Sequence, residues 1–174
     1  MSALTWAVAA VVTDRSGRVL LCRQSGGGRR WALPGGRLRR DESPAAAARR
    51  EIRAETGWDV ELIDLVGLYR LGDPTAPPPP PAGRCGALPD VLVHVFRARV
   101  ADAPAGAPAG GCQLDWHPPD ALPEALTPTT RAAIADALAG RSGVLCETTR
   151  GGDGPAGAAA PPGQRAGGEL GTLR

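Results

Sequence analysis

The 174-residue sequence predicts an α/β or α+β fold. Apolar runs rich in β-branched residues recur along the chain and are typical of strands. Two segments between them begin and end with residues that favour helix termini. Because strands and helices are interleaved, we expect a sheet with helices packed against it.

Four runs are predicted strands. Ala7–Thr13 and Val19–Arg23 are separated by the turn-forming segment Asp14–Arg18, so they are expected to form a hairpin. Val60–Tyr69 and Val91–Val100 are predicted as strands on either side of a proline-rich stretch.

The first predicted helix has clear boundary signals. Ser43 is suited to the N-cap and Pro44 to the first helical position. Gly57 is expected to end the helix. The apolar stripe that should face the sheet consists of Ala45, Ala48 and Ile52.

The second predicted helix is the last element expected in the domain. Thr127 is the expected cap, Pro128 the first residue, and Gly140 the stop. Ile134 and Leu138 are predicted to form its apolar stripe.

Glycine and proline are concentrated in two places. Ten of them lie in residues 72–89, as many as in the whole of residues 1–71. We therefore expect residues 1–148 to form one domain, with a proline-rich loop insert at 72–89. Residues 149–174 are rich in Gly, Pro and Ala and are expected to be a disordered tail.

The basic residues narrow the possible chemistry. All twenty of them are Arg, and the chain has no Asn. Lysine-based Schiff-base chemistry, a P-loop lysine and a Cys-His-Asn triad are therefore excluded. A phosphate group would have to be held by arginine, backbone N–H groups or a metal.

Apolar run length, net charge and cysteine spacing indicate which partners and which compartment to expect. No apolar run has the length of a membrane span, so no membrane partner is expected. Near-neutral charge with few aromatic residues argues against a nucleic-acid binder. The four cysteines are widely spaced without a CxxC pair, so we expect a reduced, cytoplasmic protein.

The first helix carries an unusual charge pattern. Glu51 and Glu55 lie together beside its apolar stripe, while Arg49 and Arg53 lie on the other side, with Arg50 further round. Like charges at i,i+4 cost a few tenths of a kcal/mol, which a divalent cation near the carboxylates would offset. A solvated charged face is the alternative, and metal binding is the favoured interpretation.

The segment from Gly36 to Trp58 resembles the Nudix signature, G-x5-E-x7-R-E-U-x-E-E-x-G-U, in which U is a bulky apolar residue. Eight of nine specified positions match, and Ala54 stands where the first Glu of the EE pair belongs. The segment W-x-L-P-G-G before the motif and Trp116–Pro123 after it are also similar to Nudix proteins. The matching residues are Gly36, Glu42, Arg50, Glu51, Ile52, Glu55, Gly57 and Trp58.

The resemblance implies a Nudix-type α/β/α sandwich around a mixed β-sheet, with the motif forming a loop, a helix and a second loop. It also implies hydrolysis of a pyrophosphate bond in a nucleoside diphosphate linked to another moiety, of NDP-sugar, ADP-ribose or (d)NTP type. The cofactor would be Mg²⁺ or Mn²⁺ and the partner a small nucleotide. A homodimer is compatible with this assignment.

By position in the motif, Glu55 would be a metal ligand and Glu51 a ligand or the general base. The carbonyl of Gly35 would be a further ligand, and Arg50 would orient Glu51. Gly36, Glu42 and Gly57 would brace the loops at the two ends of the helix.

The motif does not itself identify the residues that contact the substrate. Because the chain has no Lys, arginines near the motif would complete the phosphate site. Trp31 would stack on a nucleobase or, as the alternative, pack in the core. The candidate arginines are Arg23, Arg29, Arg30 and Arg37.

Ala54 leaves a second function open. Without the missing carboxylate, the protein would be a catalytically weak or silent nucleotide-binding module. Asp102, Asp115 or Asp120 would be needed if a later segment supplies a carboxylate. Both histidines, His94 and His117, are expected to be packing or strand residues.

Overall fold

The structure is a computed structural model that describes residues 4–23, 30–72, 91–101, 103–109 and 112–149. The expected loop insert at 72–89 therefore lies outside the described residues except for Gly72. The expected tail at 149–174 also lies outside them except for Thr149. These two residues end strands, so the sheet extends further in both places than the sequence predicts.

The strands form one mixed sheet in the order β6-β2-β1-β5-β4-β7, and β3 pairs with β1 beside β2. The pairs β1–β5 and β4–β7 are parallel, and the other pairs are antiparallel. The strands are β1 (Thr5–Thr13), β2 (Val19–Arg23), β3 (Gly35–Arg37), β4 (Val60–Gly72), β5 (Val91–Val100), β6 (Gln113–His117) and β7 (Val144–Thr149).

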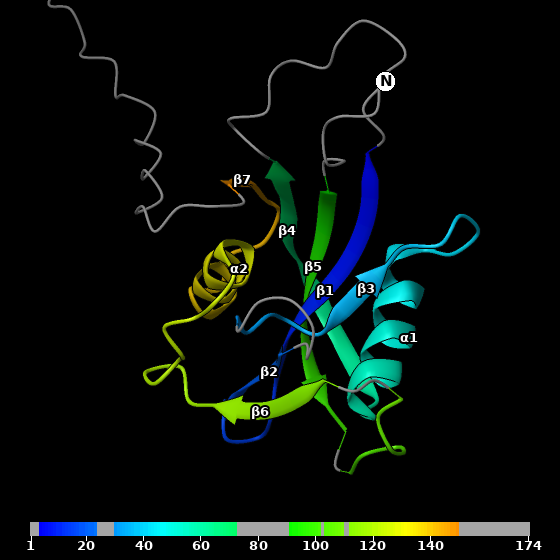
Figure 1. Ribbon diagram of the computed structural model, residues 1–174, viewed down its shortest axis with the longest axis vertical. Helices are drawn as coiled ribbons and strands as arrows, with labels where there is room; N and C mark the ends of the chain where they lie inside the picture. Colours follow the sequence, from blue (N-terminus) through cyan, green and yellow to red (C-terminus); the bar gives the residue numbers. More distant parts are fainter. Residues whose placement is uncertain (1–3, 24–29, 73–90, 102, 110–111, 150–174) are drawn as a thin grey trace, which may run out of the picture.

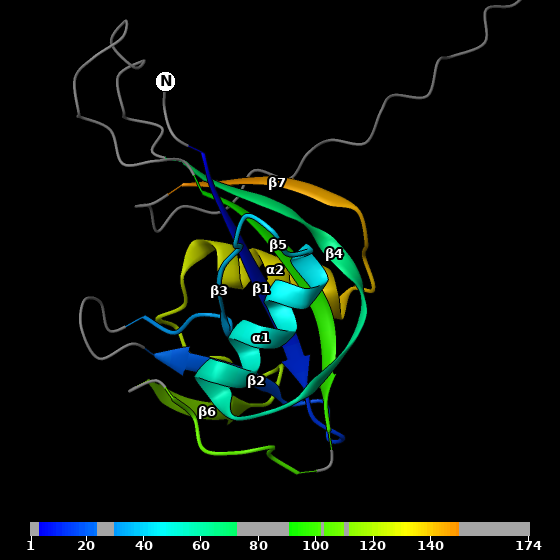
Figure 2. The same ribbon diagram turned by 90° about the vertical axis from the view of Figure 1, so that its right-hand side faces the viewer.

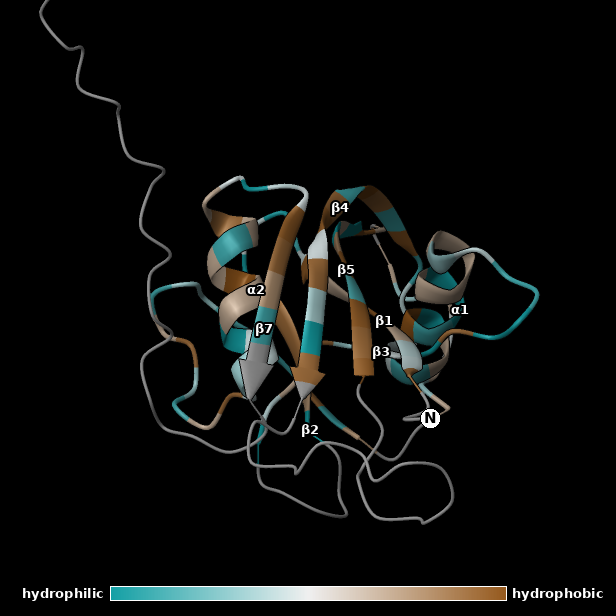
Figure 3. Cartoon of the chain, turned by 90° about the horizontal axis from the view of Figure 1, so that it is seen from above, coloured by the Kyte–Doolittle hydropathy of each residue, from teal (hydrophilic) through white to brown (hydrophobic). Residues whose placement is uncertain are grey.

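One helix covers each face of the sheet (Figures 1 and 2). α1 (Pro44–Thr56) packs on Val8, Ala10 and their neighbours, and α2 (Pro128–Leu138) packs on the opposite face with Val11 and Val66. Figure 3 shows the two helices on opposite sides of β4 and β5. This arrangement confirms the predicted α/β/α sandwich around a mixed sheet.

The predicted hairpin and helix starts are confirmed. Thr13 pairs with Val19 across the turn. The Ser43 hydroxyl accepts the Ala46 N–H at 3.2 Å, and Thr127 caps α2 in the same way. Local side-chain capping therefore sets both helix starts, as the sequence indicates.

The predicted apolar stripes are only partly right. In α1, Ala48 and Ile52 are buried as expected, but Ala45 is only half-buried. In α2, Ile134 is buried, whereas the prediction for Leu138 is wrong because this residue is 48% exposed. The buried face of α2 follows the spacing of Thr130, Ala133, Ile134 and Ala137, from which Leu138 is rotated away.

Three short strands were not predicted. β3 has the sequence Gly-Gly-Arg, which has little strand propensity, and it becomes a strand through its pairing with β1. β6 and β7 lie at the two edges of the sheet, where one neighbouring strand supplies all pairing. Among the described residues, neither helix has the length or the apolar content that crossing a bilayer requires.

Candidate active site

Two consecutive glycines of β3 meet two carboxylates of α1. Gly36 lies so close to Glu51 that a methyl group in its place would overlap the Glu51 carboxylate. The Gly35 N–H donates a hydrogen bond of 2.9 Å to Oε2 of Glu55. Since Gly35 and Gly36 pair with Ala9 and Val8 of β1, the carboxylates converge on a fixed part of the sheet.

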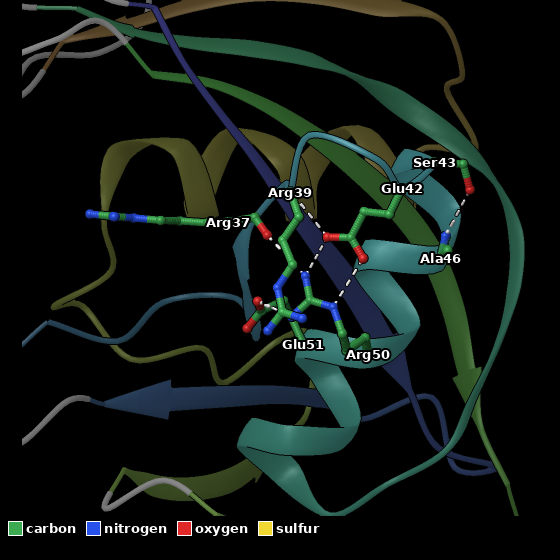
Figure 4. A network of polar contacts seen from close by, with 7 residues as sticks. All are labelled: Arg37, Arg39, Glu42, Ser43, Ala46, Arg50 and Glu51. Atoms are coloured by element: carbon green, nitrogen blue, oxygen red, sulfur yellow. Dashed lines mark hydrogen bonds and ion pairs between the residues drawn. The ribbon is translucent and has the colours of Figure 1, made fainter.

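Arg50 holds the loop before α1 against the helix (Figure 4). Its Nε donates to Oε2 of Glu42 at 3.0 Å, its Nη1 donates to Glu51, and its Nη2 donates to Glu42 and to the Arg37 carbonyl. Glu42 also accepts the Arg39 N–H at 2.9 Å. The hydrogen bonds from Arg50 hold the pKa of Glu42 below its ordinary value, and those bonds raise the pKa of Arg50.

Helical geometry alone predicts the wrong surroundings for the Arg50 side chain. It puts the arginines on the side away from the glutamates, whereas the guanidinium of Arg50 contacts Glu51. The long side chain spans the distance because Glu42 and the Arg37 carbonyl draw it toward β3. Arg53, by contrast, is exposed and pairs with Asp59 at 3.2 Å.

The segment 103–109 covers the C-terminal end of α1. Gly57 ends the helix in the left-handed conformation, with φ of +76°. The N–H groups of Ala105 and Gly106 donate to the Gly57 carbonyl, and Ala109 donates to the Ala54 carbonyl. The bond to Ala54 satisfies a carbonyl of the last helical turn, and the bonds to Gly57 attach the segment to the residue that caps the helix.

Two thiols have pKa values that the Glu55 carboxylate raises, and no sequence motif marks either of them. Cys22 lies on β2, and Cys112 immediately precedes β6. Burial raises the pKa of both thiols, and the charge and hydrogen bonding of the Glu55 carboxylate raise the pKa further. Pairing of β2 with β6 joins residues about 90 positions apart, so only the sheet brings these cysteines together.

The carboxylates fit a hard cation in part. Within the described residues, no group of three or more Asp, Glu, His and Cys side chains is arranged to hold a metal ion. Ala54, whose side chain is exposed, supplies no third carboxylate. Glu51 and Glu55 remain, and Mg²⁺ commonly binds through one or two carboxylates together with substrate phosphates.

A pocket of about 250 Å³ lies on the α2 side of β1. Ala9 is part of its wall and pairs directly with Gly35, so one strand pair separates the pocket from Glu55. Most of the wall is small and apolar, and Arg30 is the charged residue that lines it. The lining residues are Ala9, Arg30, Ala32, Leu33, Leu71, Val93 and Thr127 to Thr130.

The predicted substrate residues are not all brought to the pocket. Arg37 is exposed and lies opposite Ala7, so its side chain leaves β3 on the same face as Ala9, away from Glu51 (Figure 4). Trp31 is only 8% exposed and packs in the core, and the Arg23 guanidinium lies 5.2 Å from its ring centre. Arg29 lies outside the described residues.

The described later carboxylates and the two histidines have surroundings other than Glu51 and Glu55. Asp115 pairs with Leu21, whose side chain belongs to the α2-side core, so Asp115 faces away from α1. Asp120 is exposed in a turn, and Asp102 is outside the described residues. His94 stacks on Trp6, and His117 packs edge-on against Trp31.

Known proteins share sequence and fold with this chain. The family model described as "NUDIX domain" matches residues 3–137. A "MutT-like protein" from Streptomyces ambofaciens is 44% identical over 63 residues, which cover 36% of this chain and 40% of that protein. An "RNA pyrophosphohydrolase" from Saccharophagus degradans is 39% identical over 70 residues, covering 37% of this chain and 41% of that protein.

Solved structures share the fold. The crystal structure of a MutT NUDIX hydrolase from Burkholderia pseudomallei aligns with a TM-score of 0.63 and 24% identity. The alignment covers 77% of this chain and 98% of that one. The sequence matches to the two curated relatives, by contrast, span about two-fifths of the length of each relative.

Proposed function

The chain belongs to the NUDIX-domain family, and from this we propose that it is a divalent-metal-dependent hydrolase of nucleotide pyrophosphate bonds. The substrate is a nucleoside diphosphate linked to another moiety, of NDP-sugar, ADP-ribose or (d)NTP type. The cofactor is Mg²⁺ or Mn²⁺. Three free thiols among the described residues suit a reducing, cytoplasmic setting.

The observation that carries the proposal is the convergence of two carboxylates on β3. Glu51 lies against Gly36, and Glu55 accepts the Gly35 N–H. Each side chain is partly exposed, so a ligand has access to the oxygens. Two like-charged side chains four positions apart on one helix face repel each other. A purely structural helix face would therefore gain no stability from this pair.

Each residue of the site has a role in water attack on phosphorus. When bound, the cation neutralises pyrophosphate charge and lowers the pKa of a water molecule. Glu55, Glu51 and the Gly35 carbonyl are the groups of this chain that would hold it. Glu51 would alternatively accept the proton of the attacking water, while Arg50 fixes its carboxylate.

The pocket beside Ala9 supports a nucleotide substrate. With the pyrophosphate at Gly35, the nucleoside or the second moiety would enter this largely apolar space of about 250 Å³. Arg30 lines this pocket and Arg37 leaves β3 on the same face, and these two arginines would contact the phosphate oxygens. The absence of Lys from the chain makes these arginines the relevant cations.

The test is a substrate panel with and without Mg²⁺ or Mn²⁺. The panel contains NDP-sugars, ADP-ribose, (d)NTPs and, because one relative is named an RNA pyrophosphohydrolase, an RNA with a 5′-triphosphate. We expect multiple turnovers with at least one compound, dependent on the metal and lost in Glu51→Gln. Turnover absent throughout, or unchanged in that variant, would refute the proposal.

Ala54 favours one alternative, a nucleotide-binding module without turnover. Its exposed methyl group stands where the motif has a carboxylate, which reduces the number of metal ligands. This alternative predicts that a nucleotide raises the melting temperature while no product forms. Multiple turnovers in the panel would eliminate it.

A further inference from the structure

The face of the sheet that carries α1 is only partly covered by this helix. α1 packs on Val8 and Ala10 of β1 and on the beginning of β4 at Val60. Figure 3 shows α1 beside β1 and β3, whereas β7 lies at the other edge of the sheet, next to α2. Since α2 packs on the opposite face, no helix of the described residues covers the α1 side of β7 and of the second half of β4.

The strand registers place apolar side chains on this uncovered area. Val8, which packs on α1, pairs with His94 of β5. His94 pairs with Leu68 of β4, and Leu68 pairs with Leu145 of β7. Paired residues of adjacent strands project from the same face, and so do residues two positions apart along one strand. Trp6 and the row from Val8 to Leu145 therefore share one face.

These side chains form an exposed apolar surface. Leu145 is 80% exposed and Trp6 is 44% exposed, and neither belongs to a cluster of the core. Trp6 stacks on His94 with ring centres 5.5 Å apart, which adds an aromatic pair to the surface. A contiguous exposed apolar patch of this kind commonly marks an interaction site. We call it the β7 face, and it consists of Trp6, Leu65, Leu68, Leu92, His94 and Leu145.

The size of the β7 face allows a small interface. The face extends over β1, β5, β4 and β7, which at a spacing of about 4.8 Å gives a width of roughly 15 Å between the outer strands. With its side chains and charged rim it presents roughly 500 Å². Two such faces in contact would bury about 1,000 Å² in total, which is at the low end for specific interfaces.

The β7 face also carries one charge of each sign. Arg70 of β4 pairs with Glu147 of β7, and their side chains form an exposed ion pair of 3.2 Å. They lie two positions after Leu68 and Leu145, so they project from the same face. A two-fold axis between them would place Arg70 of each copy against Glu147 of the other. No charge would then be buried without an opposite one.

The segments that follow β4 and β7 in the sequence carry few large apolar side chains with which to cover this face. In residues 150–174 these are Leu170 and Leu173, and in residues 73–90 there is Leu88. A second copy of the chain, by contrast, brings a complete apolar surface of matching size together with the complementary charges. The composition and the charge pattern both favour a second copy as the occupant.

We propose that the β7 face is the interface of a homodimer in which two copies pack face to face about a two-fold axis. The apolar rows of the two copies interdigitate, as do the layers of a β-sandwich. Leu145 is the most exposed of these side chains, so it gains the most burial. The small area predicts a dissociation constant of about 1–100 μM. The dimer requires no hydrolytic activity, so it and the proposed function are tested separately.

The first experiment is sedimentation equilibrium of the full chain in reducing buffer, from about 1 to 200 μM. We expect a monomer–dimer equilibrium that Leu145→Ser weakens about tenfold or more, because the substitution removes apolar contact from both copies. Leu138→Ser is the matched control, since Leu138 is an exposed leucine of α2 on the opposite face. It should leave the dissociation constant within about twofold. Melting temperatures verify that each variant folds.

The second experiment uses the two charged residues. Arg70→Glu and Glu147→Arg should each weaken self-association about 3- to 10-fold, because each places like charges across the two-fold axis. An equimolar mixture of the two variants should instead form a heterodimer, since opposite charges then face each other in both directions. An ion pair that acts only within one copy would produce no such preference.

The outcomes that would overturn the interface are distinct. A full chain that stays monomeric up to about 200 μM refutes it. Equal effects of Leu145→Ser and Leu138→Ser place the contact elsewhere, and a mixture without preference for the heterodimer refutes the two-fold arrangement. If the full chain is monomeric but dimerises when Leu170→Ser and Leu173→Ser are combined, the C-terminal segment occupies the face and the proposal fails.

Discussion

The two helices begin alike but use their acidic residues differently. α1 follows Ser43 and α2 follows Thr127, and each has Pro at its first position. On α1, Glu55 is partly exposed and accepts a backbone N–H from β3. On α2, Asp136 is only 8% exposed and accepts the Tyr69 hydroxyl at 2.8 Å and Arg141 Nη1 at 2.9 Å.

The difference lies in the donors that surround each carboxylate. Asp136 is bound by a phenol and a guanidinium, which together link α2 to β4 and to the turn after the helix. Glu55 accepts a single backbone N–H and is partly exposed, so its carboxylate is open to the proposed cation. Residue type and helix position are thus insufficient to distinguish a structural carboxylate from a proposed metal ligand.

The sharpest contrast is expected between amide substitutions on the two helices. Glu51→Gln or Glu55→Gln should lower kcat by about 10²- to 10⁴-fold, because a base or metal ligand is lost. Asp136→Asn should leave kcat within about threefold, since it lies on the other face of the sheet. Steady-state kinetics on the best panel substrate measures both, with circular dichroism as the folding control. Comparable losses of kcat in both would contradict the distinction.

Stability should show the opposite order. Asp136→Ala leaves the buried Tyr69 hydroxyl without its acceptor, at an expected cost of about 1–3 kcal/mol in unfolding free energy. Urea unfolding measures this cost, and Tyr69→Phe in the same background tests its origin. In the double variant the penalty for the unpaired hydroxyl should disappear; simple additivity of the two changes would show another cause.

A substitution of Ala54 should strengthen metal binding on the α1 side of the sheet. Ala54→Glu should strengthen Mn²⁺ binding by roughly tenfold, because an additional carboxylate raises the charge and ligand number of the site. The position is exposed, so a longer side chain meets no core residue. Ala54→Gln is the matched control of similar size. An equal gain in both variants would argue against a metal-ligand effect.

The stabilities of the α2 and α1 regions should change at opposite ends of the pH scale, and the α2 region should change in alkali. Burial and the bond to Asp136 raise the pKa of Tyr69 above its ordinary value of 10. A raised folded-state pKa means that this stabilisation is complete below pH 10 and is lost as pH rises beyond it. Tyr69 is the sole tyrosine of the chain, so absorbance at 295 nm reads its ionisation directly. A midpoint at 10 in the folded protein would contradict the buried hydrogen bond.

Acid should instead weaken the stabilisation that the ion pair between Glu42 and Arg50 provides beside α1. The hydrogen bonds from Arg50 lower the pKa of Glu42 from 4.5, so its stabilising effect is present above that pH and is lost as pH falls through the lowered value. The difference in melting temperature between the unmodified chain and Glu42→Gln should therefore be largest near neutral pH and shrink in acid. A difference that is constant with pH would exclude this ion pair as its source. This is the smallest expected effect, because the pair is partly exposed.

Local rules made α1 predictable. Its cap Ser43, its first residue Pro44 and its stop Gly57 act within one turn of the helix, so their spacing is sufficient to infer both ends. The placement of Glu51 and Glu55 on one flank follows from helical geometry alone. The resemblance to the Nudix signature rests on these same neighbouring residues.

The sequence by itself determined the two helices, the central strands and the pair of carboxylates. Tertiary structure alone decided that Gly35 and Gly36 pair with β1 to receive those carboxylates, and that Trp31 packs in the core. It also paired β2, which contains Cys22, with β6, which follows Cys112 about 90 residues later in the chain. Helical spacing acts over a few residues, whereas strand pairing depends on the burial and register of the whole sheet.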